Sequence, residues 1–124
     1  MGKESDKGLS LELQIAAICQ QRGWRISLPY QQACPYDLVI DKDDKLYKVQ
    51  VKKSRACLNR SAADGWAFKM KCLHRKRCTR YNRREVDAFA TIFNGQAYMY
   101  FLKDGEKPPR SLTIKKADLP KYKL

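Results

Sequence analysis

The spacing of apolar residues changes once along this chain, and the change limits the folds that it can adopt. Over residues 9–22 apolar side chains recur every three or four positions, which is the spacing of an amphipathic helix. Beyond Gly23 they alternate with polar side chains in short stretches, as they do in half-buried strands. The stretches cover residues 24–28, 36–40, 45–51, 66–70, 86–93 and 97–102, with 112–114 as a last strand or the lead into a short C-terminal helix. We therefore predict one helix followed by a run of strands.

Turn and cap residues mark where these elements begin and end. A polar turn at residues 41–44 closes one predicted hairpin, and Asn94-Gly95, a strong hairpin signal, closes a second. Ser10 is the predicted N-cap of the helix, and Gly23 is its predicted stop. The order of elements is typical of an α+β or α/β chain with a mixed sheet.

The length of the chain fits a single domain. Domains commonly run to about 100–150 residues, and this chain has 124. Neither an internal repeat nor a linker divides the sequence. We expect residues 1–124 to form one α/β (α+β) domain with a central mixed β-sheet flanked by helices, with residues 1–8 as a frayed lead-in and residues 54–65 irregular.

The charge of the chain indicates its partner. Lysine and arginine number 26 against 13 acidic residues, which gives a net charge of +13. Such a charge opposes compaction unless a polyanion is nearby, and nucleic acid is the commonest one. Hydrophobic residues make up 44% of the chain, which excludes a disordered basic tail. No apolar run approaches the ~18 residues that span a bilayer, so we expect no membrane partner.

Cysteine usage and the first residues bear on the compartment. The start of the chain lacks the apolar stretch of a secretory signal. The five cysteines are odd in number and form no CxxC pair, so a disulfide framework is a poor interpretation. We expect an intracellular protein that is not secreted, in a cytoplasm or nucleoid or in a phage or organelle equivalent. Structural zinc stays an open alternative, although its candidate ligands match no standard finger spacing: Cys57, Cys72, His74 and Cys78.

Polar residues on two neighbouring predicted strands suit a divalent metal site. Asp37 begins the first strand, and Gln50 and Lys52 lie two apart on one face of the second. Hairpin pairing brings Asp37 near both. Asp37 offers carboxylate oxygens to a hard cation such as Mg²⁺, and Gln50 and the backbone of Val51 offer carbonyl oxygens. Lys52 is a point charge able to position or deprotonate an attacking water, or to hold the scissile phosphate.

A further acidic residue lies on the predicted helix. Glu12 shares a helix face with Ala16 and Cys19, and these small neighbours let the helix approach the sheet and aim Glu12 at the metal. The candidate catalytic residues are therefore Glu12, Asp37, Gln50 and Lys52. The candidate metal ligands are Glu12, Asp37, Gln50 and Val51.

This arrangement resembles the PD-(D/E)XK nuclease superfamily, in which an Asp, then an acidic residue, one residue and a Lys form the metal site. In that family a Glu often comes from the preceding helix. The matching pieces follow in order here as Glu12, Gly23-Trp24, residues 36–40, residues 49–52, Tyr81 and residues 85–90. Over roughly residues 9–102 the chain resembles the group I intron-associated homing endonucleases of cyanobacterial type. The resemblance implies a restriction-endonuclease-like core and a Mg²⁺ cofactor for which Mn²⁺ can substitute.

One residue departs from the superfamily pattern. Gln50 stands where the superfamily usually has Asp or Glu, and it removes one negative charge from the metal site. Metal affinity falls unless Glu12 compensates. Glutamine does occur at this position in the homing branch that the chain resembles, which supports the narrower match. It also leaves open a protein that binds its target with impaired catalysis.

Basic residues outside this motif favour contact with phosphates. Residues 69–84 hold eight lysines and arginines, more than solubility requires. The arginines are also able to read guanine edges, and residues 54–65 form a second candidate surface. Tyr81 could stack on a base, bond a phosphate or merely pack. The candidate nucleic-acid contacts are Lys53, Arg55, Arg60, Lys69, Lys71, Arg75, Lys76, Arg77, Arg80, Tyr81, Arg83 and Arg84.

We interpret the chain as a Mg²⁺-dependent endodeoxyribonuclease, a hydrolase that is homing-endonuclease-like and site-specific on double-stranded DNA. One active site cuts one strand, so a double-strand cut implies a homodimer or homotetramer. Two alternatives stay open: a Holliday-junction-resolvase-like nuclease that reads branched shape, and a non-catalytic nucleic-acid-binding module.

Overall fold

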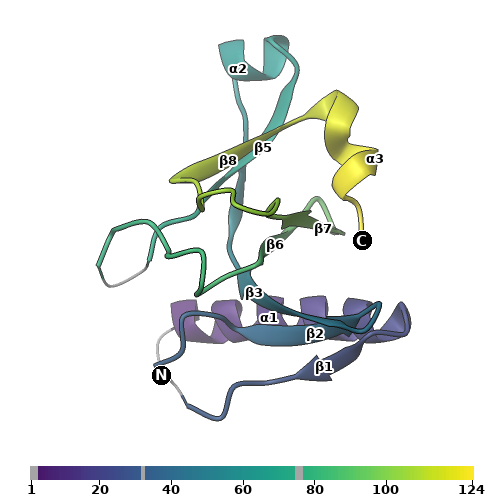
Figure 1. The fold of residues 1–124 in the computed structure, drawn as a ribbon. Coiled ribbons are helices and arrows are strands. Elements are labelled where there is room, and N and C mark those ends of the chain that lie inside the picture. Colours follow the sequence, from purple (N-terminus) through teal and green to yellow (C-terminus); the bar gives the residue numbers. More distant parts are fainter. Residues whose placement is uncertain (1–2, 32, 75–76) are drawn as a thin grey trace.

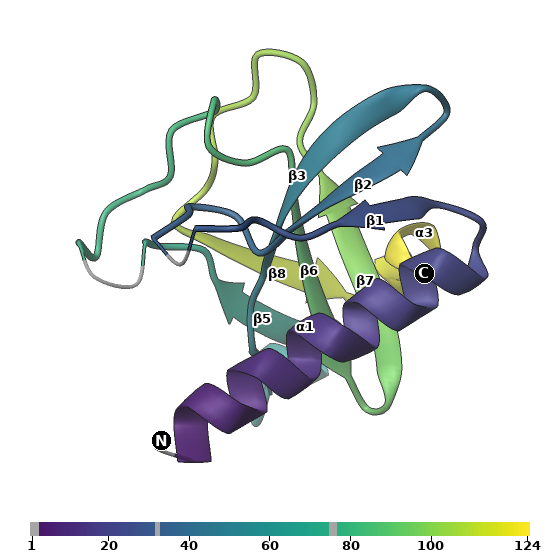
Figure 2. The same cartoon turned by 90° about the horizontal axis from the view of Figure 1, so that it is seen from below.

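Helix α1 (Lys3–Gln21) opens the chain and lies across one face of the main sheet (Figure 2). The structure is a computed structural model that describes residues 3–31, 33–74 and 77–124. The helix begins at Lys3, so residues 3–8 are helical where a frayed lead-in was predicted, and Ser10 lies inside the helix instead of capping it.

The end of α1 agrees with the prediction. Gly23 adopts a φ of 88°, a left-handed conformation that costs glycine little. Its N–H donates to the Gln20 carbonyl at 2.9 Å, and the Trp24 N–H donates to the Cys19 carbonyl at 3.2 Å. These two bonds form a Schellman motif, which satisfies the last carbonyls of the helix and turns the chain towards the first strand.

The main sheet contains β1 (Arg25–Ser27), β2 (Leu38–Lys42), β3 (Lys45–Val51), β6 (Ala88–Phe93) and β7 (Gln96–Phe101). They lie in the order β1-β2-β3-β6-β7. β3 and β6 run parallel, and the other neighbours run antiparallel. The predicted mixed sheet is therefore confirmed.

Both predicted hairpins are present, with residues of positive φ in their turns. Asp43 and Asp44 have φ values of 52° and 63°, and Asn94 and Gly95 have 49° and 76°. Two successive positive values are typical of type I′ turns, whose twist matches that of the flanking strands. The first turn sets the register of β2 on β3, which decides what lies beside Asp37.

A second, three-stranded antiparallel sheet was not expected from the sequence. It contains β4 (Ser54–Ala56), β5 (Trp66–Lys71) and β8 (Ser111–Lys115) in the order β4-β5-β8. The prediction that residues 54–65 are irregular is wrong, because they hold β4 and the short helix α2 (Arg60–Ala63). β4 is too short to show a pattern of its own, and pairing with β5 determines its conformation.

The chain ends in two short helical turns. The 3₁₀ turn η1 (Lys116–Asp118) follows β8 and leads into α3 (Leu119–Tyr122). Within the described residues, no helix combines the length and the apolar character needed to cross a membrane.

Two hydrophobic cores hold the layers together. In the first, Ile15 and Cys19 of α1 pack on Val49 and Val51 of the main sheet. The second core lies on the opposite face of β6 and β7, where Phe89 and Tyr98 meet side chains of the second sheet. Figure 1 shows α1 on one side of the main sheet and β5 with β8 on the other. The molecule is therefore a helix, a mixed sheet and a smaller sheet in layers.

Candidate active site

The start of β2 and the end of β3 bring Asp37 against the backbone of Val51. The Asp37 N–H donates to the Val49 carbonyl at 2.8 Å, and the Val51 N–H donates to Asp37 Oδ2 at 2.8 Å. Leu38 pairs with Val49 in the strand register, so the first turn of the hairpin places this contact. A strand N–H that would otherwise lack a partner thereby fixes the carboxylate.

Glu12 reaches the same place from α1. Its carboxyl group hydrogen-bonds with that of Asp37. Ile15 and Cys19 on the buried side of α1 are fully covered, and this close packing of the helix on the sheet brings Glu12 to the strand ends. Two acidic side chains from distant parts of the chain therefore meet in a half-buried position.

The two carboxyl groups perturb each other. Burial, followed by the charge of Asp37 and their hydrogen bond, raises the pKa of Glu12 to about 7. Burial also raises the pKa of Asp37, against the opposing effects of the Val51 N–H, the Glu12 hydrogen bond and the Lys52 charge. Two neighbouring carboxyl groups share a proton because close like charges disfavour ionisation. Such a pair gains from a cation placed beside it.

Lys52 directly follows β3 and lies half-buried near Asp37. Its positive charge opposes the rise that burial causes in the pKa of Asp37. Its Nζ donates to the Leu73 carbonyl at 2.9 Å and lies 5.1 Å from the ring centroid of Tyr81. Lys53 is exposed instead. The strand period therefore selects Lys52 for the site, as the sequence indicated.

Gln50 lies on the face of β3 that turns away from α1. It pairs with Phe89 in the parallel register, and Phe89 belongs to the second core. Among the described contacts, none joins the Gln50 amide to the Glu12–Asp37 pair. The structure therefore brings together Glu12, Asp37, Val51 and Lys52, with Gln50 beside them on the Lys52 face.

The predicted nucleic-acid contacts divide into several groups. Those that are exposed on the described surface are Lys53, Arg55, Arg60, Lys69, Lys71, Arg77, Arg80 and Arg84. Arg75 and Lys76 lie outside the described residues. Tyr81 is buried, with a relative exposure of 5%. A shallow pocket of about 580 Å³ is lined by Arg77, Arg80, Tyr81, Asn82, Arg84 and Glu85.

Arg83 is used within the protein. Its guanidinium bonds Asp87 Oδ1 at 2.7 Å and the Val86 carbonyl at 2.9 Å. Asp87 in turn accepts from the Lys48 N–H at 2.8 Å, and the Lys48 ammonium donates to the Arg84 carbonyl. This network holds the end of the basic loop, residues 69–84, against β3. It also gives Lys48, a polar residue of that strand, its partners.

The candidate zinc ligands lie in different surroundings. Cys72 is fully buried in the second core, and His74 packs against Tyr81 with ring centroids 5.4 Å apart. Cys78 is exposed, and the described cysteines are free thiols. Within the described parts of the chain, no three or more His, Cys, Asp or Glu residues gather as a metal cluster.

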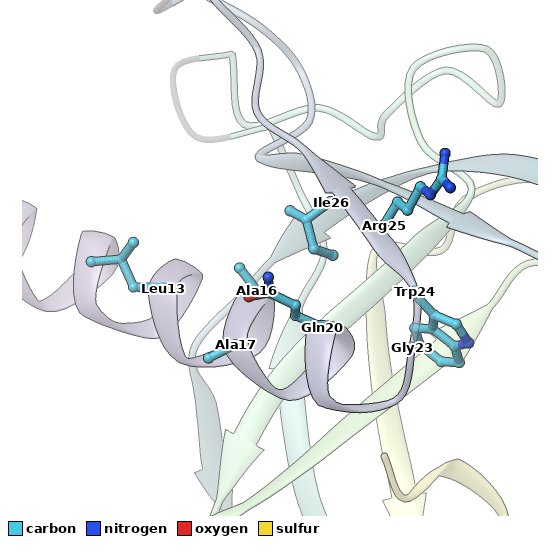
Figure 3. A pocket seen from close by; sticks show the side chains of 8 residues that line it. All are labelled: Leu13, Ala16, Ala17, Gln20, Gly23, Trp24, Arg25 and Ile26. Atoms are coloured by element: carbon cyan, nitrogen blue, oxygen red, sulfur yellow. The ribbon is translucent and has the colours of Figure 1, made fainter.

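A larger groove lies between α1 and β1, away from these groups (Figure 3). It has a volume of about 690 Å³ and is lined by Leu13, Ala16, Ala17, Gln20, Gly23, Trp24, Arg25 and Ile26. Its lining contains no carboxylate, thiol or imidazole. The groove therefore offers no group for metal or acid–base chemistry.

Sequence reasoning missed the surroundings of Lys52. Tyr81 was a candidate contact without a chosen role, and the Leu73 carbonyl carries no side-chain signal. The sequence placed Gln50 and Lys52 on one face of β3, but it did not indicate which residues lie against that face.

Comparison with known proteins places this geometry in a family. Residues 3–119 match the family described as PD-(D/E)XK endonuclease. A solved structure of a bacterial homing endonuclease, I-Ssp6803I, is similar in fold, with a TM-score of 0.65 and 22% identity over 94% of this chain and 78% of that one. Comparison with curated proteins gives no match. The matched segment holds α1, both sheets and the four candidate catalytic residues, Glu12, Asp37, Gln50 and Lys52, and the chain belongs to the PD-(D/E)XK endonuclease family.

Proposed function

We propose that this nuclease depends on a divalent metal and hydrolyses phosphodiester bonds at specific sites in duplex DNA. The contact between the Glu12 and Asp37 carboxyl groups, with the Lys52 charge beside them, carries the proposal. Acidic oxygens that hold a cation, next to a fixed positive charge, are what phosphodiester hydrolysis uses to bind phosphate and activate water.

The donors at this site suit a hard cation. Glu12 and Asp37 supply carboxylate oxygens, and Val51 adds a backbone carbonyl at the position whose N–H already binds Asp37. The raised pKa of Glu12 supports the fit, because a divalent cation would displace the shared proton. We propose Mg²⁺, with Mn²⁺ able to substitute. When bound, the ion would neutralise phosphate charge and lower the pKa of a water.

The residues of the chain have distinct proposed roles. The Val51 N–H and the Lys52 charge favour the ionised form of Asp37, against the burial that raises its pKa. Lys52 would hold a non-bridging phosphate oxygen or orient the attacking water. Gln50 lies on the same face of β3 as Lys52, and we propose its amide oxygen as a neutral ligand.

The second sheet supports duplex DNA as the substrate. Arg55 and Lys69 are directly opposite each other on β4 and β5, and both are exposed. Like charges in opposite positions of a sheet destabilise it. A polyanion bound to this surface would relieve the repulsion between the two charges. Phosphate contacts also orient a duplex over an active site.

A cut through both strands needs two active sites. We therefore propose that the protein acts as a homodimer or homotetramer. The small chain also offers few contacts for each copy, so a long target requires assembly. The similarity in fold to a bacterial homing endonuclease supports site-specific cleavage.

Incubation with a pool of random-sequence duplexes and Mg²⁺, followed by sequencing of the new ends, tests the proposal. We expect ends that share one sequence in reactions with Mg²⁺ or Mn²⁺, and none with EDTA. A four-way junction tested in parallel detects a nuclease that reads shape. Cleavage by wild type that persists unchanged in Lys52→Met would remove this site from the proposal.

One observation favours a second candidate, a module that binds DNA without cutting it. Gln50 is uncharged, and its amide makes no described contact with the carboxyl pair. Binding of the selected duplexes without cleavage at any Mg²⁺ or Mn²⁺ concentration would favour this module. In that case Gln50→Glu, which restores the usual acidic residue, is the variant in which to look for activity.

A further inference from the structure

Two groups of the basic loop, residues 69–84, hold the ammonium of Lys52. Its Nζ donates to the Leu73 carbonyl at 2.9 Å and lies over the ring of Tyr81, 5.1 Å from the centroid. The face of an aromatic ring attracts a cation within about 6 Å. Both partners come from the stretch of chain that carries the surface arginines, and neither is a residue of β2 or β3.

Tyr81 is itself fixed in place. Its ring is buried, packs edge-on against Phe89 at 5.8 Å, and contacts His74 on another side. Leu73 and Arg80 form an isolated antiparallel bridge, so the carbonyl that accepts from Lys52 and the ring beneath it are held by the same paired backbone. The two groups, the Leu73 carbonyl and the Tyr81 ring, therefore form one seat for the lysine.

The seat also adjoins the basic surface. Tyr81 lines the pocket that holds Arg77, Arg80 and Arg84, and these side chains are exposed. A phosphate bound there would contact the segment that orients Lys52.

We propose that Tyr81 is a positioning residue. Its ring face and the Leu73 carbonyl together place the Lys52 ammonium for the reaction. Residues 69–84 would then contribute to the active site as well as to DNA binding. The inference rests on the proposed nuclease function. It differs from a packing role because it requires the negative potential of the ring face and not its volume alone.

Substitutions at Tyr81 separate these roles. Tyr81→Phe keeps the ring face and loses the hydroxyl, Tyr81→Leu removes the face, and pentafluorophenylalanine at this position keeps the shape but inverts the ring potential. Tyr98→Leu is the matched control, because Tyr98 is a buried aromatic residue of the same core. It packs on Phe68, and none of its described contacts involves Lys52.

Single-turnover cleavage of the selected duplex is measured with Mg²⁺, and affinity with Ca²⁺ in its place. We expect Tyr81→Phe to cleave at the wild-type rate, and the leucine and pentafluorophenylalanine variants to be about tenfold slower or more, because small misplacements of a reacting group cost this much. Affinity should change little. Equal rates in wild type, the leucine variant and the pentafluorophenylalanine variant would overturn the proposal, as would equal losses in Tyr81→Phe.

A second measurement does not depend on cleavage. The ring current of Tyr81 should shift the ε-methylene protons of Lys52 upfield in wild type and Tyr81→Phe, and this NMR shift should vanish in Tyr81→Leu but persist in Tyr98→Leu. Absence of the shift in wild type contradicts the proposed seat. Presence of the shift in a wild-type protein that cuts no DNA would refute the nuclease function and leave the seat intact.

Discussion

At the scale of single residues, the candidate site consists of two carboxyl groups that share a proton and one lysine ammonium beside them. Glu12 and Asp37 meet although they are distant in sequence, and Lys52 lies beside Asp37. The sequence predicted that hairpin pairing brings Asp37 near Gln50 and Lys52, because a hairpin register follows from its turn; in the structure the charge of Lys52 acts on Asp37, and no described contact joins Asp37 to Gln50. The sequence did not predict Tyr81 as the support of Lys52, since that contact depends on how a long irregular segment returns to the sheet.

The pH dependence of unfolding should report the Glu12–Asp37 pair. Glu12 has a folded-state pKa of about 7, against about 4.3 in an unfolded chain. Folded protein binds the proton more tightly, so the stabilisation is complete below about pH 4 and is lost as pH rises through about 7. In EDTA, the melting temperature of wild type should therefore fall more between about pH 5 and pH 8 than that of Glu12→Gln.

Comparison of the two proteins cancels the titration of groups that they share. Mg²⁺ should raise the melting temperature of wild type most at the alkaline end of this range, where the carboxyl groups are ionised, and should affect Glu12→Gln less. Parallel pH curves for the two proteins would mean that the carboxyl pair does not share a proton.

At the scale of elements, predictions succeeded where a local signal determined the backbone. Asn94-Gly95 and the polar turn at residues 41–44 produced the expected hairpins, and Gly23 ended α1. The failures lie in β4 and at the start of α1. β4 owes its structure to pairing with β5, and α1 extends beyond its apolar stripe because a helix with a packed face can continue into polar sequence.

The contact between the basic loop and β3 gives an element-scale prediction. Asp87 accepts from the Lys48 N–H and pairs with Arg83. Asp87→Ala leaves a half-buried N–H and a guanidinium without this partner, and we expect a loss of about 1–3 kcal/mol in the free energy of unfolding. Urea denaturation measures it, with Asp104→Ala, an exposed acidic residue, as the control. Equal stability of the two variants would show that the brace contributes nothing.

At the scale of the whole molecule, the charge of +13 is spread over more than one surface. Part of it lines the pocket around Tyr81, and part lies on the outer face of the second sheet. The acidic residues of the site stand between α1 and the strand ends, within an otherwise basic protein.

Binding to duplex DNA should weaken steeply with salt. Each neutralised phosphate contributes a slope of about −0.9 to the plot of log affinity against log salt concentration, so five such contacts give a slope of about −4 or steeper. Fluorescence anisotropy over a range of NaCl concentrations, with Ca²⁺ in place of Mg²⁺, measures it. A flat response would contradict the assignment of these surfaces to DNA.

Arg55 and Lys69, the like-charged pair on the second sheet, should lower the stability of the fold and raise its affinity for DNA. Lys69→Gln removes one of two like charges that face each other across β4 and β5. In low salt and without DNA, we expect the variant to be more stable by about 0.2–1 kcal/mol, while its affinity for DNA falls. Lys103→Gln, an exposed loop position, is the control. A variant that loses stability, or keeps full affinity, would argue against this face as a DNA surface.

The parallel pairing of β3 and β6 has a consequence for how such a protein can change. Residues 53–87 leave the main sheet after β3 and Lys52 and return to it at β6, the strand adjacent to β3. All of the predicted nucleic-acid contacts lie in this segment, so under the proposed function its exchange would change the DNA target while α1, β2, β3 and Lys52 keep the candidate active site. Leu73 and Tyr81 limit that freedom, because a replacement must bring its own support for the lysine.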